Sequence, residues 1–263
     1  MDGLKVMDLS ICKKARQGLS VLTVEHGSYF KPSLKHQLTG CAILLVLIMV
    51  METCSSLDLK VQARLFNFES ASWFLSPAKH RSLRLYFYDG PKTIISLIGV
   101  SALTSFIWSF KSNKKDIRRK SLTLFLAIVM VPLLVAGGKQ YSNIYCPKEL
   151  TIFGGHAPYQ RILSIYENIN LGLSKGKCFP AGHATGGFAL MALFFCSKKK
   201  RRQVAGLITG LAAGWIMGLY QMLRGEHFLS HTLASMPASW IVIIITAKLA
   251  EALVTVDCPV EAP

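Results

Sequence analysis

Residues 121–138 read SLTLFLAIVMVPLLVAGG, a run without a single charged side chain. A helix rises 1.5 Å per residue, so about 20 apolar residues cover the ~30 Å hydrocarbon core of a bilayer. Five further stretches have the same apolar character: Leu38 to Cys54, Ile94 to Phe110, Ala181 to Cys196, Val204 to Leu223 and His231 to Val254. The pattern predicts an all-α, polytopic membrane protein with six transmembrane helices in one domain, residues 37–256.

The composition agrees with a membrane protein. Of the 263 residues, 51% are hydrophobic and 17% are charged, whereas soluble proteins average about 25% charged residues. The formal net charge of +16 is typical of nucleic-acid-binding proteins only when the basic residues gather on one surface. Here they fall between the apolar stretches, so we expect no nucleic-acid partner.

Three basic segments predict the orientation in the membrane. They hold Lys5, Lys13, Lys14, Arg16, Lys31 and Lys35, then Lys111, Lys114, Lys115, Arg118, Arg119 and Lys120, and then Lys198 to Arg202. Short loops rich in Lys and Arg face the cytoplasm. We therefore expect both termini, residues 1–36 and 257–263, on the cytoplasmic side.

Two features of the loops and helices have structural interpretations. The segment from Ser55 to Thr93 is amphipathic and rich in aromatic residues, which favours a position at the membrane interface. Gly206, Gly210, Gly214 and Gly218 recur at four-residue spacing, which predicts close packing of a neighbouring helix on that face.

The cysteines predict one disulfide. Cys146 and Cys178 both fall in the second outer loop, where the compartment can be oxidising, whereas the other five lie in spans or on the cytoplasmic side. A bond between them closes a loop and is worth about 3 to 4 kcal/mol in the chain-entropy model.

Ionisable residues collect at the outer ends of the spans. Lys139 follows the third span, His183 opens the fourth, and Arg224, His227 and His231 lie between the fifth and sixth. Ionisable groups at membrane depth are costly, and several of them at one face indicate function. Helical spacing predicts that Arg224, His227 and His231 project from one side, and the set describes a pocket for a phosphate.

The motifs in this region resemble the type 2 phosphatidic acid phosphatase and haloperoxidase superfamily, whose members carry K-x6-R-P, P-S-G-H and S-R-x5-H-x3-D on the outer side of a six-helix core. The corresponding segments are KQYSNIYCP (139–147), PAGH (180–183) and QMLRGEHFLSH (221–231). Cys146, Ala181, Gln221 and His231 stand at the family's Arg, Ser, Arg and Asp positions. The segment from Cys178 to Gly187 is similar to a bacterial branch.

The resemblance implies a membrane lipid phosphatase that needs no metal or other cofactor. His227 is then the nucleophile that forms a phosphohistidine, and His183 is the general acid. Lys139 and the backbone around Ala181 and Gly182 hold the phosphoryl oxygens. It also implies a phosphorylated membrane lipid as substrate and a periplasmic site in a bacterial inner membrane.

Two of the departures have expected replacements within the third motif. Arg224 lies one helical turn after Gln221, so its guanidinium is expected to replace the missing arginine. His231 is expected to accept a hydrogen bond and fix the tautomer of His227. The first-motif arginine has no equal replacement, although Lys148 and Arg161 are near in sequence.

Three other functions fit the same residues. The first is a phosphotransferase that passes the phosphoryl group to an acceptor other than water. The second is a metal-dependent hydrolase in which the His227-x3-His231 spacing binds zinc. The third is a degenerate, lipid-binding membrane protein. Phosphatidate, phosphatidylglycerophosphate, polyprenyl diphosphate and the phosphorylated glucosamine of lipid A are all candidate substrates, and the oligomeric state is not predicted.

Overall fold

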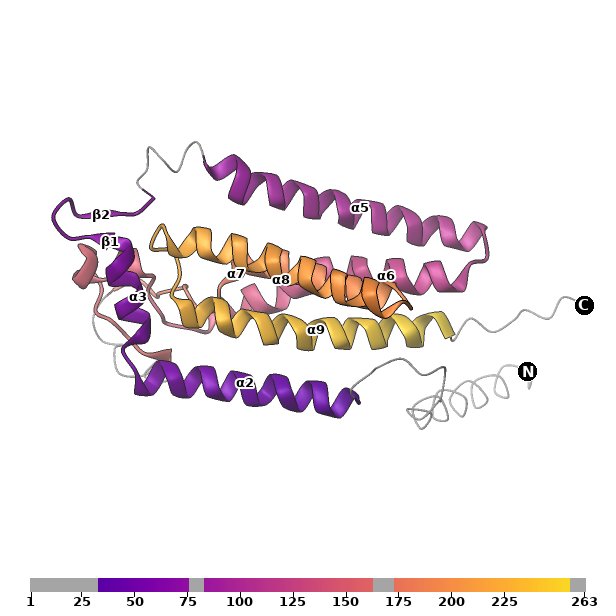
Figure 1. Ribbon diagram of the computed structural model, residues 1–263, viewed down its shortest axis with the longest axis horizontal. Helices are drawn as coiled ribbons and strands as arrows, with labels where there is room; N and C mark the ends of the chain where they lie inside the picture. Colours follow the sequence, from indigo (N-terminus) through magenta and orange to yellow (C-terminus); the bar gives the residue numbers. More distant parts are fainter. Residues whose placement is uncertain (1–32, 76–82, 163–172, 256–263) are drawn as a thin grey trace, which may run out of the picture. The chain divides into compact units, whose positions relative to one another are not determined.

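The computed structural model describes residues 33–75, 83–162 and 173–255 (Figure 1). The compact unit begins at Leu34. Most of the predicted N-terminal segment, including its six basic residues other than Lys35, lies outside the described residues, as does the predicted tail 257–263.

The long helices confirm the helical membrane character of the chain. They are α2 (Leu34–Cys54), α5 (Gly90–Lys111), α6 (Lys115–Val131), α8 (Lys200–Met222) and α9 (Leu229–Thr255). A short π-helical turn, Leu85–Asp89, precedes α5, and another, Pro132–Ala136, follows α6. Five helices among the described residues are long and apolar enough to cross a membrane. The apolar side chains exposed on the outer helices suit contact with hydrocarbon.

The apolar stretch from Ala181 to Cys196 forms a shorter helix than expected. It forms α7 (Gly182–Ala189) followed by the 3₁₀ segment Leu190–Cys196, and Ser197 has an extended backbone. Because a 3₁₀-helix rises about 2.0 Å per residue, the two pieces together span about 26 Å. The predicted count of six long helices is therefore not reached, and the stretch lies inside the bundle as its central helix.

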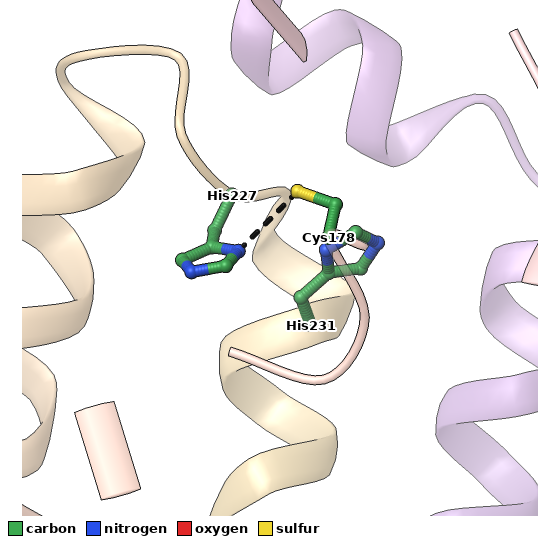
Figure 2. Close-up of side chains that lie close together, drawn as sticks. All are labelled: Cys178, His227 and His231. Atoms are coloured by element: carbon green, nitrogen blue, oxygen red, sulfur yellow. Dashed lines mark hydrogen bonds between the residues drawn. The ribbon is translucent and has the colours of Figure 1, made fainter. Parts of the chain in front are cut away.

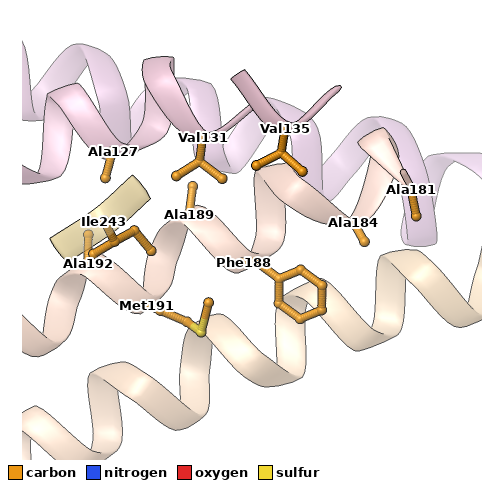
Figure 3. Close-up of a cluster of buried hydrophobic side chains, with 10 residues drawn as sticks. All are labelled: Ala127, Val131, Val135, Ala181, Ala184, Phe188, Ala189, Met191, Ala192 and Ile243. Carbon is orange, nitrogen blue, oxygen red and sulfur yellow. The ribbon is translucent and has the colours of Figure 1, made fainter. Parts of the chain in front are cut away.

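The core forms around α7 (Figure 3). Phe188, Ala189, Met191 and Ala192 pack with Ala127 and Val131 of α6 and Ile243 of α9, together with Val135, Ala181 and Ala184. These side chains are almost completely buried. The site that follows is built at the first turn of this central helix.

The glycine ridge of α8 confirms the predicted close packing. A side chain at Gly214 would overlap the ring of Phe188, and one at Gly210 would overlap the backbone of Met191. At Gly206 and Gly218, the added carbon would lie 2.7 Å from Leu193 and 2.5 Å from Thr232. The missing side chains thus bring α8 against α7, the 3₁₀ segment that follows it and the first turn of α9.

The segment after α2 is more structured than expected. It forms α3 (Leu57–Leu65) and a short hairpin of β1 (Phe66–Asn67) and β2 (Ser72–Trp73), one small antiparallel pair in an otherwise all-helical structure. Phe66 and Trp73 pack edge to face, with ring centroids 5.0 Å apart, and both contact Phe153. Phe66 and Trp73 therefore belong to a packed aromatic cluster, while Phe74 and Tyr86 of the same segment are exposed.

Candidate active site

Four elements deliver the predicted site residues. Lys139 lies in the 3₁₀ turn Gly138–Gln140 that ends the α6 segment, and His183 lies in the first turn of α7. His227 occupies the connection between α8 and α9, and His231 lies in the first turn of α9. Residues far apart in sequence therefore meet at one end of the helices.

Two histidines form the centre of the site. Nδ1 of His183 lies 3.2 Å from Nε2 of His227, and the ring centroids are 5.4 Å apart. His227 is 1% exposed, whereas His183 is partly exposed. A proton on Nδ1 of His183 and a lone pair on Nε2 of His227 suit this contact.

The connection between α8 and α9 corrects one expectation. Arg224, His227 and His231 were expected on one continuous helix face, but α8 ends at Met222 and α9 begins at Leu229. Gly225 has φ +70°, a left-handed conformation that glycine adopts at low cost and that ends a helix. The turn directs Arg224 and His227 to different parts of the site.

A cavity of about 230 Å³ opens beside His183. Its other lining residues are Arg84, Tyr88, Gln221, Arg224 and Glu226. Arg224 donates from Nη1 to Oε1 of Gln221 at 3.0 Å, and its Nη2 lies 3.2 Å from Glu226. The guanidinium therefore stands beside the side chain at the motif position where arginine is missing.

Lys139 and the start of α7 form another side of the site. A side chain added at Gly182 would lie 3.1 Å from Cε and 3.4 Å from Nζ of Lys139, so the ammonium lies against the first turn of α7. A helix leaves its first N–H groups without intrahelical acceptors, and such groups bind anions. The expectation for Ala181 changes, because its N–H donates to the carbonyl of His231 at 3.4 Å.

His231 lies beside the pair in an aromatic setting. Its ring contacts Phe179 and Phe228 edge to face, and its centroid is 6.0 Å from that of His227. Nδ1 of His231 has no hydrogen-bond partner among the described residues. Nδ1 of His227 instead lies 3.4 Å from Sγ of Cys178.

Cys178 joins this site to the outer loop. The structure links Cys146 and Cys178 in a disulfide with Cα atoms 5.1 Å apart. Figure 2 shows Sγ of Cys178 next to the ring of His227, with His231 on the other side. Ligand atoms of these three residues lie within 4.8 Å of one another, which is close enough to hold a metal ion. While the disulfide is intact, however, Cys178 offers no thiolate to a metal.

Comparison of the sequence with models of protein families identifies the family of this chain. The model of the PAP2 superfamily matches residues 120–254, slightly more than half of the chain. The chain belongs to the PAP2 superfamily. The matched part contains Lys139, His183, Arg224, His227 and His231. Neither the comparison with curated proteins nor that with solved structures gave a match.

Three residues of this PAP2 protein's cavity were missed in the sequence. The turn at Gly225 brings Glu226 to the cavity, where it pairs with Arg224 and with Lys148 at 2.9 Å. Arg84 and Tyr88 enter from the turn before α5, outside the matched part. In the sequence, the one signal that Glu226 lines the cavity was its charge within the third motif.

The disulfide of the PAP2 protein gives a direct prediction. Peptide mapping without reductant is expected to recover Cys146 joined to Cys178, and Cys41 as a free thiol. Cys146→Ser should lower stability by about 3 to 4 kcal/mol, the loop-closure value, measured as a lower melting temperature in detergent. Two free thiols at these positions in native membranes would contradict the pairing.

The burial of His227 predicts a pH dependence of stability. Burial lowers the pKa of His227 well below its ordinary value near 6.5, and Lys139 adds to the effect. Below pH 6.5 the unfolded chain therefore binds a proton that the folded protein excludes, so stability is retained above this pH and lost as the pH falls below it.

His227→Asn removes this titration, so its melting temperature should fall less between pH 7 and pH 5 than that of the wild type. The exposed His156 provides the control, because His156→Asn should follow the wild type. Parallel curves for His227→Asn and the wild type would show that His227 protonates equally in both states.

Proposed function

We propose that this PAP2 protein is an integral membrane phosphatase that hydrolyses a phosphomonoester or diphosphate of a membrane lipid without a metal ion. The supporting observation is the contact between His183 and His227, 3.2 Å apart, beside the cations Lys139 and Arg224. Membership of the PAP2 superfamily is consistent with phosphatase activity.

The proposed reaction has two steps. The lone pair on Nε2 of His227 attacks phosphorus, the bond from phosphorus to the lipid oxygen breaks, and imidazolium His183 gives its proton to that oxygen. Neutral His183 then takes a proton from water, whose oxygen attacks phosphorus and breaks the bond to Nε2. Inorganic phosphate leaves, and the two histidines regain their starting protonation.

The geometry sets the path of the phosphate. The cavity reaches His183 but not His227, so the phosphoryl group enters past His183 and separates the two nitrogens. Lys139 and the amides of Gly182 and His183 hold its oxygens as negative charge develops. Sγ of Cys178, 3.4 Å from Nδ1 of His227, accepts from this nitrogen in place of the family's carboxylate.

The proposal also assigns the site to the outer, periplasmic face of a bacterial inner membrane, with both termini cytoplasmic and the α7 segment as the sixth crossing. The basic turn between α5 and α6 and the basic start of α8 lie at the opposite ends of their helices from the site (Figure 1). Loops rich in Lys and Arg face the cytoplasm, which supports this orientation.

Arg224 is expected to bind the transferring phosphoryl group. A guanidinium has five N–H donors, so the contacts to Gln221 and Glu226 leave donors for substrate. Arg224→Ala should lower kcat/KM by about 10 to 100-fold, because a lost hydrogen bond to a charged group costs about 1.5 to 3 kcal/mol. Arg119→Ala, at the other end of the bundle, should match the wild type. Equal kcat/KM for Arg224→Ala and the wild type would reject this role.

The function is tested by phosphate release from purified protein in lipid micelles. Phosphatidate, phosphatidylglycerophosphate and polyprenyl diphosphate are offered separately with a strong chelator present. We expect inorganic phosphate from at least one of them at a rate that the chelator does not change. A phosphorylated lipid product instead would indicate a phosphotransferase, and loss with chelator would indicate a metal-dependent hydrolase.

The lipid is identified by mass spectrometry of cells with and without the protein, where one species should lose a phosphate. A protein that binds these lipids and releases no phosphate from any of them would be a lipid-binding member of the family, and the proposal would be wrong.

A further inference from the structure

Helix α3 contacts the segment that carries the nucleophile, although its own residues lie outside the part of the sequence that matches the family model. It spans Leu57–Leu65, whereas the match begins at residue 120. Asp58 and Gln62 lie one turn apart on its inner face and are 4% and 0% exposed. Buried polar side chains are costly unless they are hydrogen-bonded, so their partners show what the helix holds.

Both partners lie in the segment that carries His227. Nε2 of Gln62 donates to the carbonyl oxygen of His227 at 2.8 Å. Oδ1 of Asp58 accepts the N–H of Ser230 at 3.0 Å, and Oδ2 accepts the hydroxyl of Ser230. Two side chains of one short helix therefore hold the backbone of the nucleophile and the first turn of α9.

The carboxylate supplies a helix cap that the local sequence lacks. The first N–H groups of a helix need acceptors, and the residue just before the helix usually provides one from its side chain. That residue is Phe228, which has no side-chain acceptor. Asp58 accepts hydrogen bonds from Ser230 and Leu229 instead, and a carboxylate at this end also suits the helix dipole.

The apolar face of α3 fixes the residue between these contacts. Phe228 is 2% exposed and belongs to the same packed cluster as Leu59 and Ala63 of α3. Its ring also meets Tyr159 edge to face, with centroids 5.7 Å apart. The segment from His227 to Ser230 is thus held at its carbonyl, at its aromatic ring and at its helix cap.

We propose that Asp58 and Gln62 are positioning residues that hold the His227 imidazole in line for attack on phosphorus. The proposal rests on the assignment of His227 as the nucleophile. Neither residue contacts substrate; each acts through the backbone of the segment from His227 to Ser230. Displacement of a reacting group by about 1 Å can cost on the order of 100-fold in rate, so such support bears directly on catalysis.

The test compares paired variants of the full chain in lipid micelles. Gln62→Met keeps the length of the side chain but removes the donor to His227 and the amide oxygen, which has no partner among the described residues. Asp58→Leu removes the cap. Asp58→Asn keeps an acceptor for the Ser230 N–H and can donate to the Ser230 hydroxyl, so it should rescue. Lys60→Ala changes the exposed face of the same helix.

We expect Gln62→Met to lower kcat about 3 to 10-fold, because the hydrogen bond to the His227 carbonyl is lost. The melting temperature should change little, because the substitution also removes the buried amide oxygen that has no partner among the described residues. Asp58→Leu should lower kcat about 10 to 100-fold, with KM within about twofold of wild type because the phosphate-binding cations are not moved. Asp58→Asn and Lys60→Ala should match the wild type.

Amide hydrogen exchange provides a readout that does not depend on activity. Exchange in the segment from His227 to Ser230 should accelerate in Asp58→Leu and Gln62→Met and not in Asp58→Asn. Unchanged kcat and exchange in the first two variants would overturn the proposal, as would accelerated exchange with full kcat. A wild-type protein that releases no phosphate overturns the function instead, while exchange still decides whether α3 holds the segment.

Discussion

His227→Ala abolishes phosphate release in this account, with an expected loss of about 10⁴-fold or more in kcat, because the atom that forms the covalent intermediate is removed. Among the described residues, Nε2 of His227 has one hydrogen-bond contact, to Nδ1 of His183 at 3.2 Å, and the proposed mechanism already uses His183 as the acid. The loss should be the same for every lipid substrate, measured as inorganic phosphate released by purified protein in micelles.

The matched control is His156→Ala, which removes an exposed imidazole of the outer loop and should leave the rate unchanged. The His227→Ala protein should still purify as a membrane protein, since the helices of the bundle are untouched. Phosphate release by His227→Ala within tenfold of the wild type would remove His227 from the mechanism.

His183→Ala should lower phosphate release by about 10² to 10⁴-fold, the usual contribution of a general acid. The loss should depend on the leaving group, because His183 donates the proton that the departing oxygen needs. With p-nitrophenyl phosphate, whose leaving group departs as a stable anion, His183→Ala should regain much of its rate in the first step. His227→Ala should regain none.

The different rates of His183→Ala and His227→Ala on p-nitrophenyl phosphate distinguish the general acid from the nucleophile. The partly exposed His183 opens onto the cavity and reaches the leaving group, whereas His227 is buried behind it. If the two variants lose equal activity on the lipid and on p-nitrophenyl phosphate, the assignment of acid and nucleophile is incorrect.

Much of the fold followed from hydropathy and spacing in the sequence. Apolar runs predicted the ends of α2, α5, α8 and α9 to within about four residues, whereas α6 begins six residues before its predicted start. The four glycines of α8 predicted its close packing, which is against α7, the 3₁₀ segment that follows and the start of α9. Motif residues predicted that Lys139, His183 and His227 meet. Local patterns suffice here because each helix carries its own length and periodicity.

Other features depend on tertiary contacts that no local pattern records. The turn at Gly225 separates Arg224 from His231 and brings Glu226 to the cavity, although the sequence alone suggested a continuous helix. The buried faces of Asp58 and Gln62 meet residues more than 160 positions away. The central α7 segment is shorter than the five long helices because its helical part covers only the residues from Gly182 to Cys196.

The most direct test is to trap the covalent intermediate. Wild-type protein is mixed with lipid carrying radiolabelled phosphate and quenched with alkali, under which a phosphohistidine survives, and the labelled peptide is identified by mass spectrometry. We predict label on His227 in the wild type and none in His227→Ala. Label on another residue, or its persistence in His227→Ala, would contradict phosphoryl transfer through His227.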